Sequence, residues 1–260
     1  QGPNWPDYMG QIAMVGATPV YAKVDEHCDF KMTADIIEPL ITEKTKLIII
    51  NSPSNPTGSV LDEEELRDIA ELVKKYKVFL ISDEPYREIV FAGFKSEWIP
   101  HIYKDTIVCY SFSKSLSVPG ERIGYVVVPN EVADAETVIS GINVSNRTLG
   151  FVNAPSLLQK AVARCLDEKT NIDFYDENRM MLYEGLTKLG FTCIKPEGAF
   201  YLWVKSPVEN EKEFCEAAKK YNILIVPGSS FGCPGYVRMA YCVAYETIVN
   251  SLPKFKELAK

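Results

Sequence analysis

The most informative stretch of this 260-residue chain is Ser111-Phe112-Ser113-Lys114-Ser115-Leu116-Ser117-Val118-Pro119-Gly120-Glu121-Arg122-Ile123-Gly124. It follows an apolar, strand-like segment and surrounds Lys114 with serine hydroxyls, with Arg122 further along. A lysine can form a Schiff base with an aldehyde, and hydroxyls and a fork-shaped guanidinium suit a phosphate group. In isolation, such a lysine would most often be a surface residue in a serine-rich loop.

Two further motifs favour a ligand site over that simpler interpretation. Asn51-Ser52-Pro53-Ser54-Asn55-Pro56-Thr57-Gly58 and Ser82-Asp83-Glu84-Pro85-Tyr86 each follow an apolar run. Taken alone, the first could be a plain turn and Asp83 could be a helix cap. Open α/β sheets, however, bind ligands beyond the carboxyl ends of their strands. The three motifs therefore predict one site for a molecule with an aldehyde and a phosphate, such as pyridoxal 5′-phosphate (PLP).

Apolar runs alternate with helical patterns, which is typical of βαβ units. We expect strands at residues 19–24, 46–51, 78–82, 107–110 and 123–128, and helices at 61–76, 131–142, 155–167 and 173–189. In the helix at 61–76, Asp62 is the expected N-cap, with Glu65 completing a capping box. After Gly190, short strands at 192–195, 199–204, 223–226 and 237–240 are interleaved with helices at 211–221 and 245–258.

These patterns predict an α/β protein in two parts. Residues 1–160 are expected to form a larger domain with a mostly parallel sheet flanked by helices, and residues 161–260 a smaller α+β domain. The formal net charge of −7 argues against nucleic acid or an anionic membrane as a partner, and no apolar stretch is long enough to span a bilayer. Seven dispersed cysteines fit reduced thiols in a cytoplasmic protein. No cysteine or histidine cluster predicts a metal site.

The three motifs, in this order, resemble the class I/II aminotransferases of PLP fold type I. The matching pieces are N-P-T-G at Asn55–Gly58, D-E-P-Y at Asp83–Tyr86, and S-x-S-K followed by R-x-G at Ser111–Gly124. Later similarities lie at Pro196–Trp203, Pro227–Gly232 and Val237–Ala240. The resemblance covers essentially the whole chain, and it implies that the larger domain is the PLP-binding one.

The resemblance also implies a role for each matching residue. Lys114 would be the Schiff-base lysine and proton shuttle, Asp83 the partner of the pyridine nitrogen, and Tyr86 a partner of the ring 3′-oxygen. These three are the expected catalytic residues. The expected cofactor site comprises Trp5, Asn55, Asp83, Tyr86, Ser111, Ser113, Lys114 and Arg122, with Trp5 stacking on the ring and the serines and Arg122 holding the phosphate. Asn55 and Arg238 would bind the substrate.

The implied activity is transfer of an amino group between an amino acid, with aspartate the default for the subgroup, and a 2-oxo acid. The implied assembly is a homodimer. Two alternatives remain open: a PLP-dependent C–S β-lyase, which shares the motifs, and a non-catalytic remnant of the fold. Members of the family usually carry a long segment before the position of Trp5. The large domain is therefore expected to be incomplete at its N-terminal side.

Overall fold

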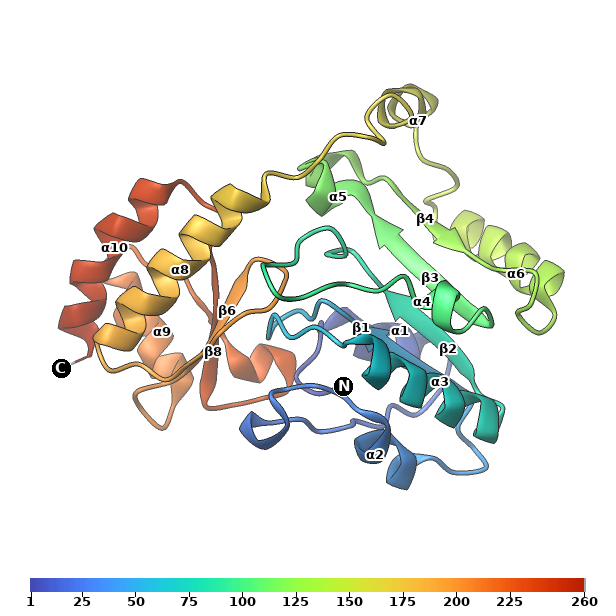
Figure 1. Ribbon diagram of the computed structural model, residues 1–260, viewed down its shortest axis with the longest axis horizontal. Coiled ribbons are helices and arrows are strands. Elements are labelled where there is room, and N and C mark those ends of the chain that lie inside the picture. The colour runs from blue at the N-terminus through green and yellow to red at the C-terminus, as the bar shows by residue number, and fades with distance from the viewer. Residues whose placement is uncertain (260) are drawn as a thin grey trace.

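The computed structural model describes residues 1–259, and it contains two four-stranded sheets. Figure 1 shows them in two lobes that meet near the middle of the molecule. The first sheet contains β1 (Leu47–Asn51), β2 (Phe79–Asp83), β3 (Thr106–Ser111) and β4 (Gly124–Val127), in that order. The first three strands are parallel, and β4 runs antiparallel to β3. The predicted α/β architecture with a mostly parallel sheet is confirmed.

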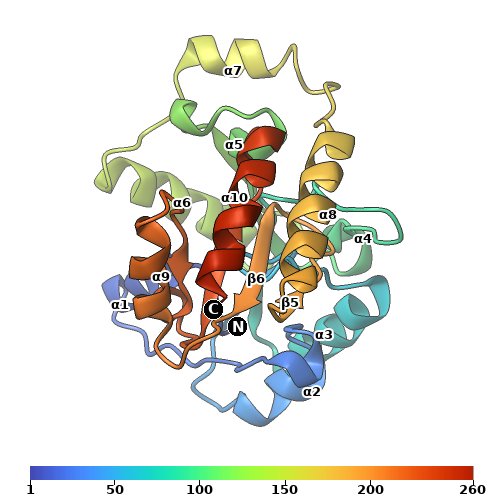
Figure 2. The same cartoon turned by 90° about the vertical axis from the view of Figure 1, so that its left-hand side faces the viewer.

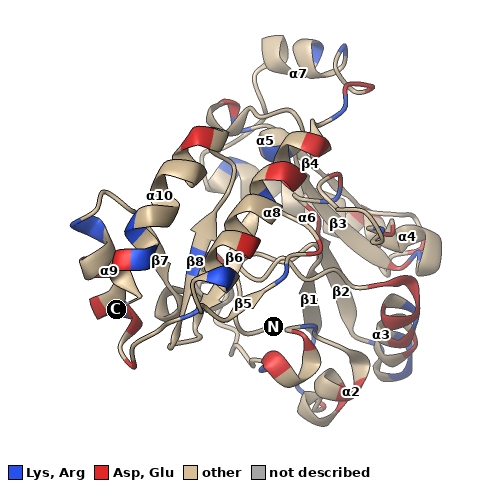
Figure 3. Ribbon diagram, turned by 60° about the vertical axis from the view of Figure 1, so that its left-hand side comes forward, with Lys and Arg blue, Asp and Glu red and all other residues tan. Residues whose placement is uncertain are grey.

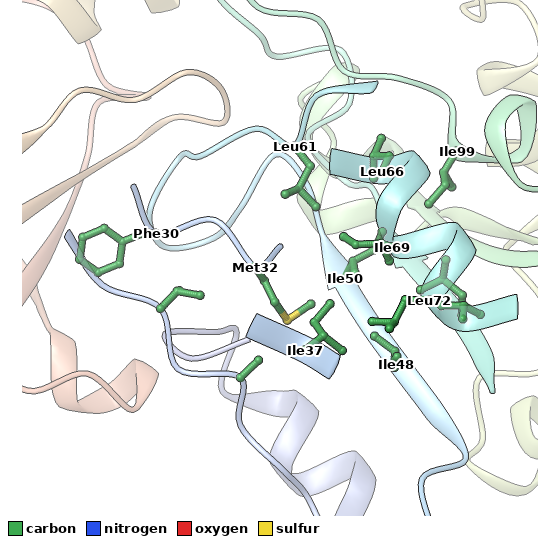
Figure 4. Close-up of a cluster of buried hydrophobic side chains, with 14 of the residues drawn as sticks. Phe30, Met32, Ile37, Ile48, Ile50, Leu61, Leu66, Ile69, Leu72 and Ile99 are labelled. Atoms are coloured by element: carbon green, nitrogen blue, oxygen red, sulfur yellow. The ribbon is translucent and has the colours of Figure 1, made fainter. Parts of the chain in front are cut away.

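Helix α3 (Glu63–Tyr76) connects β1 to β2 and forms as its sequence predicts. The Asp62 carboxylate accepts a hydrogen bond from the Glu65 backbone N–H, and the Glu65 side chain accepts one from the Asp62 N–H, which completes the capping box. Its apolar face, which includes Leu66, Ile69 and Leu72, packs on Ile48 and Ile50 of β1 (Figure 4). This crossover fixes the direction of β2 and so the edge at which its carboxyl end lies.

The other helices of this lobe are α1 (Asp7–Met14), α2 (Ala34–Ile37), α4 (Ile99–Ile102), α5 (Phe112–Ser115), α6 (Ala135–Thr148) and α7 (Ser156–Val162). Several expectations are wrong in detail. Helix α7 ends at Val162 instead of residue 167, and the strand expected at 223–226 forms at 226–227. Helix α6 starts and ends later than the expected 131–142. Residues 19–24 form no strand. Within residues 1–259 they make only an isolated parallel bridge with Gly2, and the next N–H that could extend it, that of Asn4, donates to the Phe231 carbonyl instead.

The second sheet contains β5 (Cys193–Ile194), β6 (Tyr201–Lys205), β7 (Val226–Pro227) and β8 (Tyr236–Ala240). Its order is β5-β6-β8-β7, and all its pairs are antiparallel. Helices α8 (Ile172–Lys188), α9 (Glu211–Lys219) and α10 (Tyr245–Leu258) accompany this sheet (Figure 2). This is the expected smaller α+β part, although the boundary at residue 160 falls inside α7 and stays a prediction.

The two lobes interlock beside the sequence motifs. The Gly198 N–H donates to the Gly58 carbonyl at 2.8 Å, and the Phe91 N–H donates to the Glu197 carbonyl at 3.0 Å. Trp203 of β6 is fully buried in the core of the first lobe, where it meets Phe30 edge-on. The end of the first motif, Gly58, is therefore hydrogen-bonded to the segment that precedes β6. Charged residues of both signs are interspersed over the helices (Figure 3), and no helix within residues 1–259 is long and apolar enough to cross a membrane.

Candidate active site

The carboxyl ends of three neighbouring strands carry the three motifs. Strand β1 ends at Asn51, β2 at Asp83 and β3 at Ser111, and Asn51 and Asp83 are direct register partners. Because the three strands are parallel, their carboxyl ends share one edge of the sheet. The predicted convergence of the motifs is therefore what the structure shows.

Asn51 joins the first two motifs through its side-chain amide. Its Nδ2 donates to the Asp83 carbonyl at 2.8 Å, and its Oδ1 accepts from the Asn55 backbone N–H at 2.8 Å. One buried side chain thus fixes the spacing between Asn55 and Asp83. No specific role for Asn51 was expected, since an asparagine at the end of a strand is typical of a turn.

Asp83 has an unexpected partner, Tyr8 of α1, whose hydroxyl donates to the Asp83 carboxylate. Burial raises the pKa of Asp83, and the hydrogen bond from Tyr8 opposes that rise by stabilising the carboxylate. Burial and the neighbouring carboxylate raise the pKa of Tyr8, so the phenol keeps its proton. The net pKa of Asp83 stays raised by burial, and the hydrogen bond from Tyr8 is the contact that favours its carboxylate form.

Lys114 lies on α5, directly after the end of β3. Its Nζ is 5.8 Å from the centre of the Tyr86 ring and 5.6 Å from that of Phe200. Within residues 1–259, no side chain accepts a hydrogen bond from this amine or forms an ion pair with it. Burial lowers the pKa of Lys114, and the positive charges of Arg122 and Arg238 lower it further. The amine is thus more readily deprotonated than that of a surface lysine, as a nucleophile requires.

The residues expected to hold the phosphate flank Lys114. Ser111 caps α5 by accepting from the Ser113 N–H at 3.2 Å, and the two hydroxyls lie 2.8 Å apart. Arg122 is exposed and donates to the Pro119 carbonyl at 2.9 Å. Sterics require a glycine at the last position of the R-x-G motif, because a Cβ at Gly124 would lie 2.3 Å from the Tyr110 carbonyl oxygen.

Trp5 is less integrated than the other predicted residues. Its side chain is 39% exposed, and its Nε1 donates to Asp7 at 3.1 Å. No hydrogen bond or aromatic contact among residues 1–259 joins it to the rest of the predicted site. Its expected stacking role therefore stays a prediction.

Arg238 of β8 reaches the site from the other lobe. One terminal nitrogen, Nη1, donates to the Asn55 Oδ1 at 2.8 Å, and its guanidinium lies over the Tyr201 and Phe231 rings at 4.1 and 4.7 Å. Its Nε is buried without a hydrogen-bond partner among the described residues. Tyr86, in turn, places its hydroxyl 3.0 Å from that of Tyr201.

A search for related proteins agrees with this geometry. Residues 1–251 match the family "Aminotransferase class I and II". The chain belongs to this family. It is 32% identical to an aspartate aminotransferase of Geobacillus stearothermophilus and 34% identical to a probable aspartate/prephenate aminotransferase of Aquifex aeolicus, covering 98% of this chain and 68% of each relative. The structure matches an amino transferase from Eubacterium rectale with a TM-score of 0.91 and 44% identity, over 98% of this chain and 66% of the other.

Members of this family transfer amino groups with PLP, and each relative named above is called an aminotransferase, which favours that activity over the β-lyase. The residues present fit the cofactor. Lys114 offers a free amine, Asp83 a partly buried carboxylate, and Ser111 and Ser113 two adjacent hydroxyls. The buried Nε of Arg238, which lacks a partner, fits a substrate carboxylate. No cluster of three or more His, Cys, Asp or Glu suited to a metal occurs within the described part of the chain.

Proposed function

We propose that the site at this sheet edge performs the amino transfer of the family, with the residues in the roles that the motifs predict. One observation carries the proposal. The unpaired amine of Lys114 lies 5.8 Å from the centre of the Tyr86 ring, and the Tyr86 hydroxyl lies 3.0 Å from that of Tyr201. The Tyr201 ring in turn contacts the guanidinium of Arg238, which donates to Asn55. This chain of contacts supports a candidate nucleophile and a candidate carboxylate receptor, one from each lobe, beside the same pair of phenols.

The chain's own groups would act as follows. When bound, PLP supplies a ring that takes up the electron pair freed at the substrate Cα. The Lys114 Nζ moves the proton between that Cα and the cofactor C4′. The Asp83 carboxylate holds a proton at the pyridine nitrogen, which its negative charge favours. Because the Asn55 Oδ1 already accepts from Arg238, its Nδ2 is free to donate to the ring 3′-oxygen alongside the Tyr86 hydroxyl.

Substrate binding would depend mainly on Arg238. A guanidinium pairs with a carboxylate through two parallel hydrogen bonds, and contacts with the Tyr201 and Phe231 rings restrict the orientation of the Arg238 guanidinium. Both substrates, an amino acid and a 2-oxo acid, carry the carboxylate that this site would receive. Since the Geobacillus relative is named for aspartate and the Aquifex relative for aspartate and prephenate, we include aspartate as the amino donor.

The proposal includes a homodimer in the cytoplasm. Large apolar side chains on and beside α6 and α7 are exposed, among them Leu149, Phe151 and Leu157. Exposed apolar patches of this kind commonly mark surfaces where another polypeptide packs.

The direct test is to find which lysine PLP attaches to. The protein is incubated with PLP, reduced with borohydride, digested and analysed by mass spectrometry. We expect the label on Lys114, its loss in Lys114→Ala, and no change in Lys160→Ala, a control at an exposed lysine of α7. A panel of amino acids then identifies the donor. Labelling of another lysine while Lys114 stays unmodified would refute the assignment.

A further inference from the structure

Tyr201 is the first residue of β6 and only 7% exposed, and no motif gave it a role. In the register of β6 and β8, Tyr201 pairs with Ala240 and Trp203 pairs with Arg238. Side chains two residues apart on a strand point to the same face, so Tyr201 and Arg238 are diagonal neighbours on one face of the sheet. Diagonal pairs are within reach when one side chain is aromatic and the other is long.

The ring of Tyr201 supports the guanidinium of Arg238. The Arg238 Cζ lies 4.1 Å from the centre of the Tyr201 ring, closer than its 4.7 Å approach to Phe231. A cation over an aromatic face is attracted to it, more strongly when both are shielded from water. With Asn55 holding one end of the guanidinium at 2.8 Å, the ring restricts the remaining rotation of the guanidinium plane.

The hydroxyl of Tyr201 reaches a different residue. It lies 3.0 Å from the hydroxyl of Tyr86, which is 4% exposed and comes from the turn after β2 in the other lobe. Two phenols that share one hydrogen bond have one proton left over. If Tyr201 donates, the Tyr86 proton is free for another acceptor, and the direction of the Tyr86 O–H is fixed by its partner.

We propose that Tyr201 is a positioning residue of the active site: its hydroxyl aims the Tyr86 proton at the cofactor 3′-oxygen, and its ring orients Arg238 for the substrate carboxylate. The inference rests on the proposed function, because it takes the roles of Tyr86 and Arg238 from there. One side chain thus couples the cofactor side of the site to the substrate side, across the junction of the two lobes. The two parts of the side chain can be separated by substitution.

The test uses the PLP-loaded protein and two readouts. The first is the apparent pKa of the visible absorbance band, which a donor to the 3′-oxygen lowers. The second is the dissociation constant of acetate, the simplest carboxylate, at constant ionic strength. Tyr201→Phe keeps the ring, so we expect the band pKa to rise by about 0.4–1 units while acetate binding changes by less than about twofold. Tyr201→Leu removes the ring as well, and acetate binding should weaken by about fivefold or more.

A double-mutant cycle distinguishes positioning from general damage. If the Tyr201 hydroxyl acts through Tyr86, then adding Tyr201→Phe to Tyr86→Phe should move the band pKa no further than Tyr86→Phe alone. Tyr183→Phe, a half-buried tyrosine of α8 whose hydroxyl has no partner within residues 1–259, is the matched control and should leave both readouts unchanged.

Three results would overturn the inference. They are an unchanged band pKa in Tyr201→Phe, additive shifts of the band pKa in the double variant, and equal weakening of acetate binding by Tyr201→Phe and Tyr201→Leu. Borohydride labelling of another lysine while Lys114 stays unmodified would instead overturn the proposed function itself. In that case the inference falls with it, and the two failures are told apart by the site of the label.

Discussion

Removal of the Tyr8 hydroxyl should destabilise the protein in a manner that depends on pH. The Tyr8 hydroxyl donates to the Asp83 carboxylate, and burial already raises the pKa of that carboxyl. A hydrogen bond to a charged group contributes about 1.5–3 kcal/mol, which corresponds to about 1–2 pKa units. In Tyr8→Phe, the pKa of Asp83 in the folded state should therefore rise further by about that amount.

The direction of this pH-dependent change in stability follows from the linkage between proton binding and folding. An acid whose pKa is raised by folding releases its proton less readily in the folded state, so it opposes folding above both pKa values and has no effect below both. Tyr8→Phe should accordingly lower the free energy of unfolding by about 1.5–3 kcal/mol near pH 7. The loss should shrink as the pH falls from the folded pKa of Asp83 in the variant to its lower folded pKa in the wild type, because the unfolded pKa is common to both proteins.

Urea unfolding of Tyr8→Phe without PLP, measured at several pH values, checks this expectation. Two controls accompany it. Tyr183→Phe should show no pH-dependent loss. In the Asp83→Asn background, the stability lost through Tyr8→Phe should depend little on pH, because no carboxylate remains to titrate. A loss of stability that is equal at every pH would show that Tyr8 contributes packing alone, and our account of the pair would then be wrong.

Three further substitutions test other parts of the site. Asp83→Asn keeps the shape of the side chain but removes the charge that would hold the pyridine nitrogen protonated. Single-turnover rates should therefore fall by orders of magnitude, because electrostatic groups of this kind commonly lower a barrier by several kcal/mol. A rate equal to that of the wild type would make Asp83 a structural residue. Arg238→Lys should weaken the binding of both amino acids and 2-oxo acids by about 1.5–3 kcal/mol. It should hardly affect the binding of an amine that has no carboxylate. Equal losses for both kinds of substrate would indicate damage to the fold. Gly124→Ala should unfold at a lower temperature than the wild type, because its Cβ would lie 2.3 Å from the Tyr110 carbonyl oxygen; an unchanged midpoint would mean that β4 shifts freely.

The sequence predicted the first three strands and α3 well, because their physical signals are local. Strand β1 is a continuous run of β-branched and apolar residues, and α3 has a capping box and one apolar face. The direction of β4 and the absence of a strand at residues 19–24 were not predictable in this way. Both depend on which backbone lies alongside, and in the second case Gly2 is the only residue within 1–259 that forms a β-bridge to the segment.

The same distinction separates the site residues that the sequence revealed from those that it missed. Asn55, Asp83 and Lys114 follow strand ends, and parallel strands bring their ends together without any knowledge of side-chain packing. Tyr8 and Tyr201, in contrast, find their partners 75 and 115 residues away along the chain. No periodicity or spacing marks such contacts, and a tyrosine in an apolar run reads as core. The groups that we propose for the chemistry could therefore be predicted from the sequence, whereas their partners Tyr8 and Tyr201 could be identified only from the folded structure.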